Sequence, residues 1–261
     1  MNTVNKNLYE MNLVGAEKKS SSWATRESYI TDITVVTVLF DGRMTGVPHT
    51  VGVYTPEWVD KLYRGIARNY HGMFELICLT DRQYRFEEPI KQVRFEKSVD
   101  QYGWMSCLEV YRPDLCQGKR FTIGLDTIIT GPLDGILSYN AKIALCSDPM
   151  IQGTVCNAVT ICDSQFCEEL WMMWRNNEDK LIRESQLEIG WHTFPSEMSL
   201  LRNHYSDSPL LDKIFPNQIL SYKQHILGKA PHLLDNSSII YFHGVPKPHQ
   251  LKDSWVKECW V

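Results

Sequence analysis

The sequence predicts an α/β fold in which a mixed, mainly parallel sheet is flanked by helices. The run ITVVTVLF, residues 33–40, is apolar or β-branched throughout, which is typical of a strand buried on both faces. A helical pattern follows at 56–70, and a second apolar run, FELICLTD at 74–81, comes next. A strand, a helix and another strand in this order form the start of a parallel sheet with right-handed crossovers.

The first helix has both a start signal and an apolar face. Thr55 is a suitable N-cap, Pro56 stands at the first helical position, and Glu57 lies in the first turn. Apolar side chains recur at helical spacing: Trp58, Leu62, Ile66 and Tyr70. The segment is therefore expected to pack one face on the sheet.

Further strands and one long helix follow in order along the chain. Strands are expected at 90–95, 120–126, 141–147, 155–162 and 237–244. A helix capped by Ser164 is expected over 164–185. The stretch between that helix and the last strand is rich in loops.

Composition favours an ordinary globular domain. The chain has 261 residues, 43% apolar and 22% charged, and a net charge of −4, which argues against tight nonspecific nucleic-acid binding but leaves room for a local basic patch. No apolar run reaches the roughly 18 residues that span a bilayer. The N-terminus lacks a signal-peptide core. We expect residues 1–30 to be an extension, 31–261 to be a single domain, and the protein to be cytoplasmic without a membrane partner.

The eight cysteines indicate free thiols. Several, such as Cys78 and Cys146, lie in apolar strand-like runs, and no CxxC pair occurs. Buried free thiols are expected, and neither a disulfide framework nor a cysteine zinc site is.

Ligand sites in open α/β sheets form at the carboxyl ends of the strands. Asp81, Asp126 and His243 each follow an apolar strand-like run. A carboxylate in such a place can bind Mg²⁺ or Mn²⁺, and the alternative for Asp126 is a simple turn residue.

The segment FHGVPKP, residues 242–248, offers a second candidate site. Its prolines exclude a helix, so His243, Gly244 and Lys247 are expected in a tight loop. Imidazole binds Mn²⁺ readily and lysine neutralises phosphate. The alternative is a surface loop with a solvated lysine and a hydrogen-bonded histidine.

Two motifs in this order resemble those of a known enzyme family. IGLDTIITGPLDGIL, residues 123–137, resembles the strand and loop of GT-A glycosyltransferases, whose pattern is LDxDxxxxxxLDxL. FHGVPKP resembles the HxGxxKP motif of the glycogenin and galactosyltransferase-like clan. VVTVLF, residues 35–40, looks like the nucleotide-binding first strand, and FPNQILSYKQHI, residues 215–226, is similar to a segment of bacterial and phage members.

The resemblance implies a GT-A (Rossmann-like) fold and a metal-dependent glycosyltransferase. Such an enzyme moves a hexosyl or pentosyl group from a nucleoside diphosphate sugar, with UDP-sugar preferred, to a hydroxyl, and this clan favours retention. By the same resemblance, Asp126 and His243 would hold Mn²⁺ or Mg²⁺ and Lys247 would contact the donor diphosphate. The remaining donor-binding candidates are Val38, Leu39, Asp81, Leu125 and Gly244.

The sequence departs from the family pattern at two places. Gly124 stands where the first aspartate is expected, which puts the donor ribose contact in doubt, and Cys107 stands where relatives often carry lysine. Glu197 falls near the expected acceptor and is the third catalytic candidate. Weaker candidates are Asn157 and Asp163 for sugar hydroxyls, Lys223 for phosphate, and Trp171 and Trp174, which are expected in the core rather than under a sugar.

Two other functions stay open at this point. The acceptor could be a glycan, a small molecule or modified DNA, since some phages glycosylate hydroxymethylated bases with folds of this kind. The missing aspartate also allows a non-catalytic protein that binds sugar nucleotides, or a protein partner, on a decayed GT-A fold.

Overall fold

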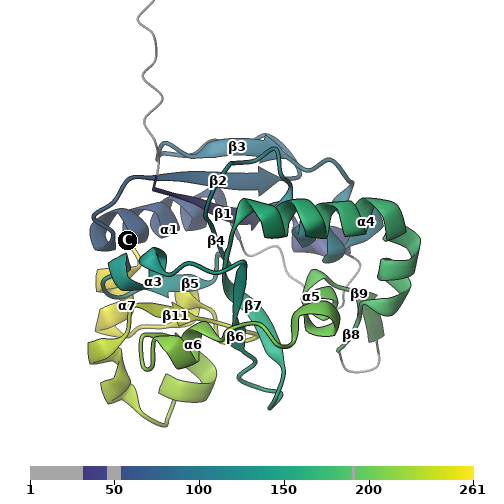
Figure 1. Cartoon of the computed structure of the whole chain (residues 1–261). Helices are drawn as coiled ribbons and strands as arrows, with labels where there is room; N and C mark the ends of the chain where they lie inside the picture. The colour runs from purple at the N-terminus through teal and green to yellow at the C-terminus, as the bar shows by residue number, and fades with distance from the viewer. Residues whose placement is uncertain (1–31, 46–53, 190–191) are drawn as a thin grey trace, which may run out of the picture. The chain divides into compact units, whose positions relative to one another are not determined.

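A computed structural model describes residues 32–45, 54–189 and 192–261 of the chain. Their elements belong to one compact unit, Thr31–Val261, shown in Figure 1. The expected extension at 1–30 lies outside the described residues.

The central sheet has six strands in the order β3-β2-β1-β4-β7-β6. Its strands are β1 (Ile33–Leu39), β2 (Phe74–Thr80), β3 (Lys91–Arg94), β4 (Arg120–Ile123), β6 (Ile143–Ser147) and β7 (Val155–Cys162). Strands β3, β2, β1 and β4 are parallel, whereas β7 runs antiparallel to both its neighbours. The mixed, mainly parallel sheet is therefore confirmed. The carboxyl ends of β1, β2 and β4 share one edge with the start of β7.

A second sheet brings the C-terminal region next to the segment that contains Asp126. It contains β10 (Ile219–Ser221), β11 (Ile239–Tyr241) and β5 (Thr127–Ile129), with β11 antiparallel to β5. A separate hairpin joins β8 (Gln186–Ile189) to β9 (His192–Pro195). Because Tyr241 pairs with Thr127, the residues after β11 lie beside the residues before β5.

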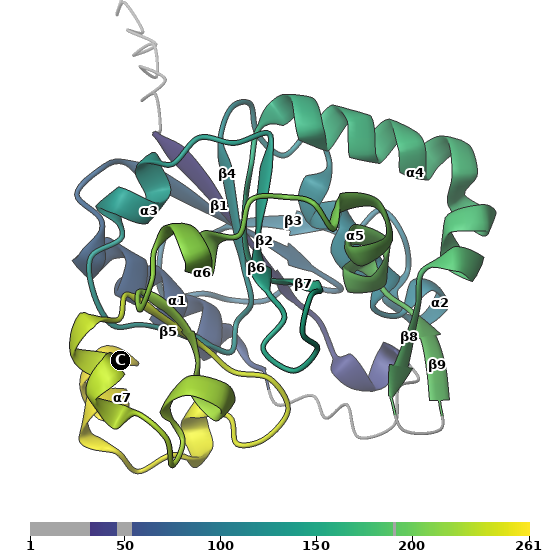
Figure 2. The same cartoon turned by 60° about the horizontal axis from the view of Figure 1, so that its bottom comes forward.

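Helices cover both faces of the central sheet. The α-helices of the described residues are α1 (Pro56–Asn69), α2 (Val99–Tyr102), α3 (Asp134–Ser138), α4 (Ser164–Glu184), α5 (Glu197–Tyr205), α6 (Leu211–Ile214) and α7 (Ser254–Cys259). Figures 1 and 2 show α4 running across the sheet on the side away from α1. The expected cap of α4 is wrong, because the Asp163 carboxylate, and not Ser164, accepts the Phe166 N–H at 2.7 Å.

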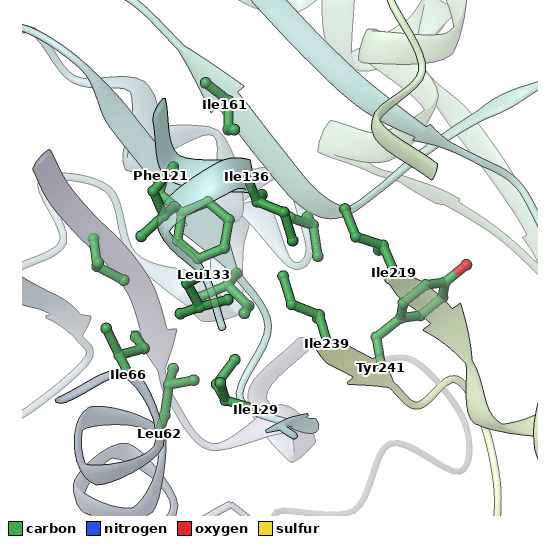
Figure 3. Close-up of a cluster of buried hydrophobic side chains, with 14 of the residues drawn as sticks. Leu62, Ile66, Phe121, Ile129, Leu133, Ile136, Ile161, Ile219, Ile239 and Tyr241 are labelled. Carbon is green, nitrogen blue, oxygen red and sulfur yellow. The ribbon is translucent and has the colours of Figure 1, made fainter. Parts of the chain in front are cut away.

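Apolar side chains fill the space on each face of the sheet. On one face, Leu62 and Ile66 of α1 pack with Phe121 of β4 and Ile239 of β11, as Figure 3 shows. On the other face, Trp174 of α4 is 2% exposed and belongs to the core, as expected. The expected free thiols are confirmed, and five of the eight cysteines are buried: Cys78, Cys146, Cys156, Cys162 and Cys167.

Two expected strands are shorter in the structure by three residues or more. The strand expected at 120–126 ends at Ile123, where its pairing with Val159 of β7 also ends. The chain then leaves the central sheet to form β5, and Asp126 lies in the connection. The strand expected at 237–244 is reduced to the three residues of β11, since β5 offers only three partners.

No helix in the described ranges is long and apolar enough to cross a membrane.

Candidate functional site

A cavity of about 460 Å³ opens at the sheet edge where β1 and β4 end and β7 begins. Its walls come from these strands, from the residues after β11, from the turn at 148–151 and from the start of α5. The polar side chains that line it include Asp126, Asp148, Asn157, Glu197 and His243. The cavity lies at the edge where the strand order predicts a ligand site.

Asp126 is held in the wall of this cavity by backbone and side-chain contacts. Its backbone carbonyl accepts the Phe242 N–H at 2.9 Å, which follows from the pairing of β5 with β11. Its Oδ2 atom accepts the Tyr54 hydroxyl at 3.1 Å and also the ammonium group of Lys247. Asp126 is therefore a paired carboxylate in the cavity wall and more than a simple turn residue.

His243 follows β11 and reaches the same cavity. Its Nδ1 lies 3.4 Å from the Ser221 hydroxyl, while its buried Nε2 has no hydrogen-bond partner. Burial and the nearby charge of Lys223 lower the pKa of His243, which favours the neutral imidazole that binds metals. Gly244 then adopts a left-handed backbone with φ of 63°, which favours glycine.

Lys247 completes the group that the sequence predicted from two distant motifs. Its ammonium pairs with Asp126, and the two side chains are only 17% and 19% exposed. The same ammonium lies 5.8 Å from the centre of the Tyr54 ring. Lys223 is a second cation nearby, because a Cβ on Gly244 would lie 3.8 Å from its Nζ atom.

These residues fit a divalent cation that is shared with a bound phosphate group. The described residues contain no cluster of three or more His, Cys, Asp or Glu side chains able to hold a metal. Asp126, with its carboxylate, and His243, with its unpartnered Nε2, line one cavity and are side chains there that could hold a cation. Mg²⁺ and Mn²⁺ sites with one or two protein ligands are commonly completed by substrate phosphates and water.

Glu197 is a buried acid in the same cavity. It starts α5 and is 3% exposed. Tyr111 donates its hydroxyl to Oε1 at 3.1 Å, and the Asn157 amide donates to Oε2. Burial raises the pKa of Glu197 to about 7, although these two hydrogen bonds act in the opposite direction. Asn157 therefore reaches the cavity as a partner of Glu197.

The other donor-binding candidates occupy different positions. Val38 lines the cavity, whereas the side chains of Leu39 and Leu125 are buried in the core and leave only their backbone for a ligand. Asp81 follows β2 at the same sheet edge, but it is outside the described cavity lining. Its carboxylate accepts the Tyr84 hydroxyl at 2.8 Å and pairs with Arg82 at 2.8 Å.

Some of the weaker candidates lie away from the cavity. Asp163 caps α4 at the opposite edge of the sheet, because β7 runs antiparallel to β4. Cys107 does line the cavity, and burial keeps its pKa far above the ordinary value for a thiol.

Sequence reasoning missed Tyr54 and an ion pair between Asp148 and Arg202. Asp148 accepts the N–H groups of Met150 and Ile151 and pairs with the Arg202 guanidinium at the cavity wall. Neither Tyr54 nor this pair belongs to a spacing pattern that sequence reasoning can detect, since each contact joins residues more than 50 positions apart.

Comparisons with known proteins support the fold. Neither protein-family models nor curated proteins match the chain. The structure is similar to the glycosyltransferase GlyE of Streptococcus pneumoniae TIGR4, with a TM-score of 0.53 and 13% sequence identity. The match covers 82% of this chain and 55% of GlyE. The apo form of GlyE gives the same values. It is also similar to the apo structure of the bifunctional glycosyltransferase WbbM, with a TM-score of 0.50 and 12% identity over 85% of this chain and 47% of that one. This chain thus spans about half the length of these proteins, and at such identity the likeness shows a glycosyltransferase fold.

Proposed function

We propose that this chain is a glycosyltransferase that moves a sugar from a nucleoside diphosphate sugar, preferably a UDP-sugar, to a hydroxyl acceptor. We assign the activity to residues 31–261 as one domain. The observation that carries the proposal is that Asp126 and His243 line one cavity on a glycosyltransferase fold and that Lys247 pairs with Asp126 there. Neutral imidazole, carboxylate and ammonium together suit a diphosphate with its cation.

Asp126 and His243 would hold the cation, Mn²⁺ or Mg²⁺. When bound, the cation would stabilise the negative charge that develops on the leaving nucleoside diphosphate. His243 supplies an imidazole nitrogen without a protein partner, and its lowered pKa favours the neutral ring, in which one nitrogen carries no proton and can bind a metal.

Lys247 would act directly on the leaving group. An ammonium has three N–H donors, so Lys247 can keep its bond to Asp126 and donate to a diphosphate oxygen as well. Its position in a partly buried wall strengthens this interaction, because charges interact more strongly where water is excluded. The Lys247 ammonium would therefore stabilise the negative charge on the leaving nucleoside diphosphate.

Glu197 lines the same cavity and would act near the acceptor. Its two oxygens are fixed by Tyr111 and Asn157, so the carboxyl keeps one orientation in the cavity. With a pKa of about 7, Glu197 exists in both protonation states near neutral pH, so it can exchange a proton with a hydroxyl or stabilise positive charge on the sugar.

Release of free nucleotide tests the proposal. The protein is incubated with a panel of UDP- and GDP-sugars, with Mn²⁺ or with a chelator, and free nucleotide is measured. Metal-dependent release from at least one donor supports the transferase. Absence of both turnover and metal-dependent donor binding would instead favour a non-catalytic protein. Transfer to hydroxymethylated DNA in the same assay would identify a nucleic-acid acceptor.

A further inference from the structure

The two oxygens of the Asp126 carboxylate have different surroundings. Oδ2 accepts both the Tyr54 hydroxyl and the Lys247 ammonium. Oδ1 has no hydrogen-bond donor among the described residues, and it faces Gly124, where an added Cβ would lie only 3.1 Å away. The carboxylate is thus anchored through one oxygen and open at the other.

Tyr54 is well placed to fix this orientation. Its ring packs edge-on against Trp58 with centroids 4.9 Å apart, and Trp58 is 5% exposed at the start of α1. A tyrosine hydroxyl carries its proton at neutral pH and is therefore a hydrogen-bond donor to the carboxylate. The hydroxyl therefore restrains the Asp126 side chain in one rotamer.

Gly124 provides the space on the other side of the carboxylate. Its backbone does not require glycine, because its φ lies outside the left-handed region. The nearby Oδ1 is the only heavy atom within 4 Å of an added Cβ in the described structure, so what a side chain here would disturb is the Asp126 carboxylate.

We propose that Tyr54 and Gly124 are positioning residues that present Oδ1 of Asp126 to the divalent cation. Tyr54 holds Oδ2, the missing side chain at Gly124 leaves room beside Oδ1, and Asp126 and His243 line the same cavity. This inference rests on the proposed function. Under this inference, Gly124 stands where the family pattern has another aspartate, and its lack of a side chain makes room for the Asp126 carboxylate.

Calorimetric titration with Mn²⁺ in the presence of UDP tests this inference on the full-length chain. Tyr54→Phe removes only the hydroxyl, and Gly124→Ala adds only the Cβ. Each variant should weaken Mn²⁺ binding about tenfold, as expected for the loss or distortion of one contact to a charged group. The affinity for UDP without metal should stay at the wild-type value, because Lys247 is intact.

Two variants serve as matched controls. Tyr102→Phe removes a hydroxyl that is bonded to Glu178, and Gly135→Ala adds a Cβ with no atom within 4 Å in the described structure. Both should bind Mn²⁺ like the wild type. Circular dichroism and thermal melts check that all variants fold.

The outcomes separate the inference from the proposed function. Suppose that the wild type binds Mn²⁺ in the presence of UDP and that the folded variants Tyr54→Phe and Gly124→Ala bind it equally well. This result would refute the inference but would leave the proposed function supported. If the wild type itself binds no Mn²⁺ in the presence of UDP, both fall. Weaker Mn²⁺ binding that is matched by an equal loss of metal-free UDP binding would point to general damage of the site and also overturn the inference.

Discussion

Lys247 donates its ammonium to the Asp126 carboxylate across 121 positions of the chain. The contact exists because β11 pairs with β5, which places the residues after β11 beside the β4–β5 connection. The C-terminal strand thus brings the Lys247 ammonium to the edge of the central sheet. This arrangement leads to four predictions and a final test.

Lys247→Met should weaken UDP binding in the presence of Mn²⁺ by about 10- to 100-fold, the range expected for a hydrogen bond between charged groups. Turnover should fall as well, since the leaving diphosphate loses its cation. Calorimetry with UDP measures the effect. Lys180→Met, which replaces an exposed lysine on α4, is the control and should bind like the wild type. Equal binding by both variants would refute the phosphate contact.

Glu197 should make stability depend on pH. Burial raises its pKa from 4.5 to about 7, so the folded protein holds this proton more tightly than the unfolded chain does. The free energy of unfolding should therefore fall by about 3 kcal/mol in total as the pH rises from about 4.5 to 7. Above pH 7 this contribution should no longer change.

Glu197→Gln isolates this effect, because the variant carries no titrating group at 197. The free energy of unfolding of the variant relative to wild type should increase between pH 5 and pH 8. Urea denaturation at both pH values provides the measurement. A difference that does not change with pH would show that Glu197 is ionised normally.

His243 should keep its affinity for metal below the ordinary pKa of histidine. Burial and Lys223 lower the pKa of His243, so more than half of the imidazole is neutral at pH 6.5, the ordinary pKa of histidine. The Mn²⁺ affinity of the wild type with UDP should hold down to that pH and fall only below it. His243→Ala should bind Mn²⁺ weakly at every pH. A wild-type affinity that is already halved at pH 7 would contradict the lowered pKa.

Trp174→Ala should destabilise the protein by about 3–5 kcal/mol, since this indole is buried between α4 and the sheet. Trp171→Ala, a neighbour that is only partly buried, should cost less. Urea denaturation measures both. Loss of sugar transfer with unchanged stability would instead make Trp174 a sugar platform.

The sheet could be predicted because its strands other than β3 are mainly buried. Runs such as 33–40 and 74–81 carry an apolar signal that does not depend on distant partners, and Pro56 marks the start of α1 locally. The direction of β7 could not be predicted, since parallel and antiparallel strands buried in a core have the same composition. The short strands β5 and β10 depend on pairing with β11.

The candidate site was predictable only where its residues lie in motifs. Asp126, His243 and Lys247 came from two segments, and the structure places them together. Tyr54 contacts Asp126 and Arg202 lines the cavity through tertiary packing, which no local sequence spacing indicates. Similarly, Asp163 caps α4 because its carboxylate accepts the Phe166 N–H. The sequence alone does not show which of two adjacent capping residues, Asp163 or Ser164, makes this contact.

The central claim is that Asp126, His243 and Lys247 form one metal-assisted diphosphate site. Calorimetric titration of UDP into the wild type and into Asp126→Asn, with Mn²⁺ and with a chelator, tests it most directly. The wild type should bind UDP at least tenfold more tightly with Mn²⁺, as expected when metal coordination adds to the phosphate contacts, and Asp126→Asn should lose that gain. UDP binding that is indifferent both to Mn²⁺ and to the Asp126→Asn substitution would contradict the claim.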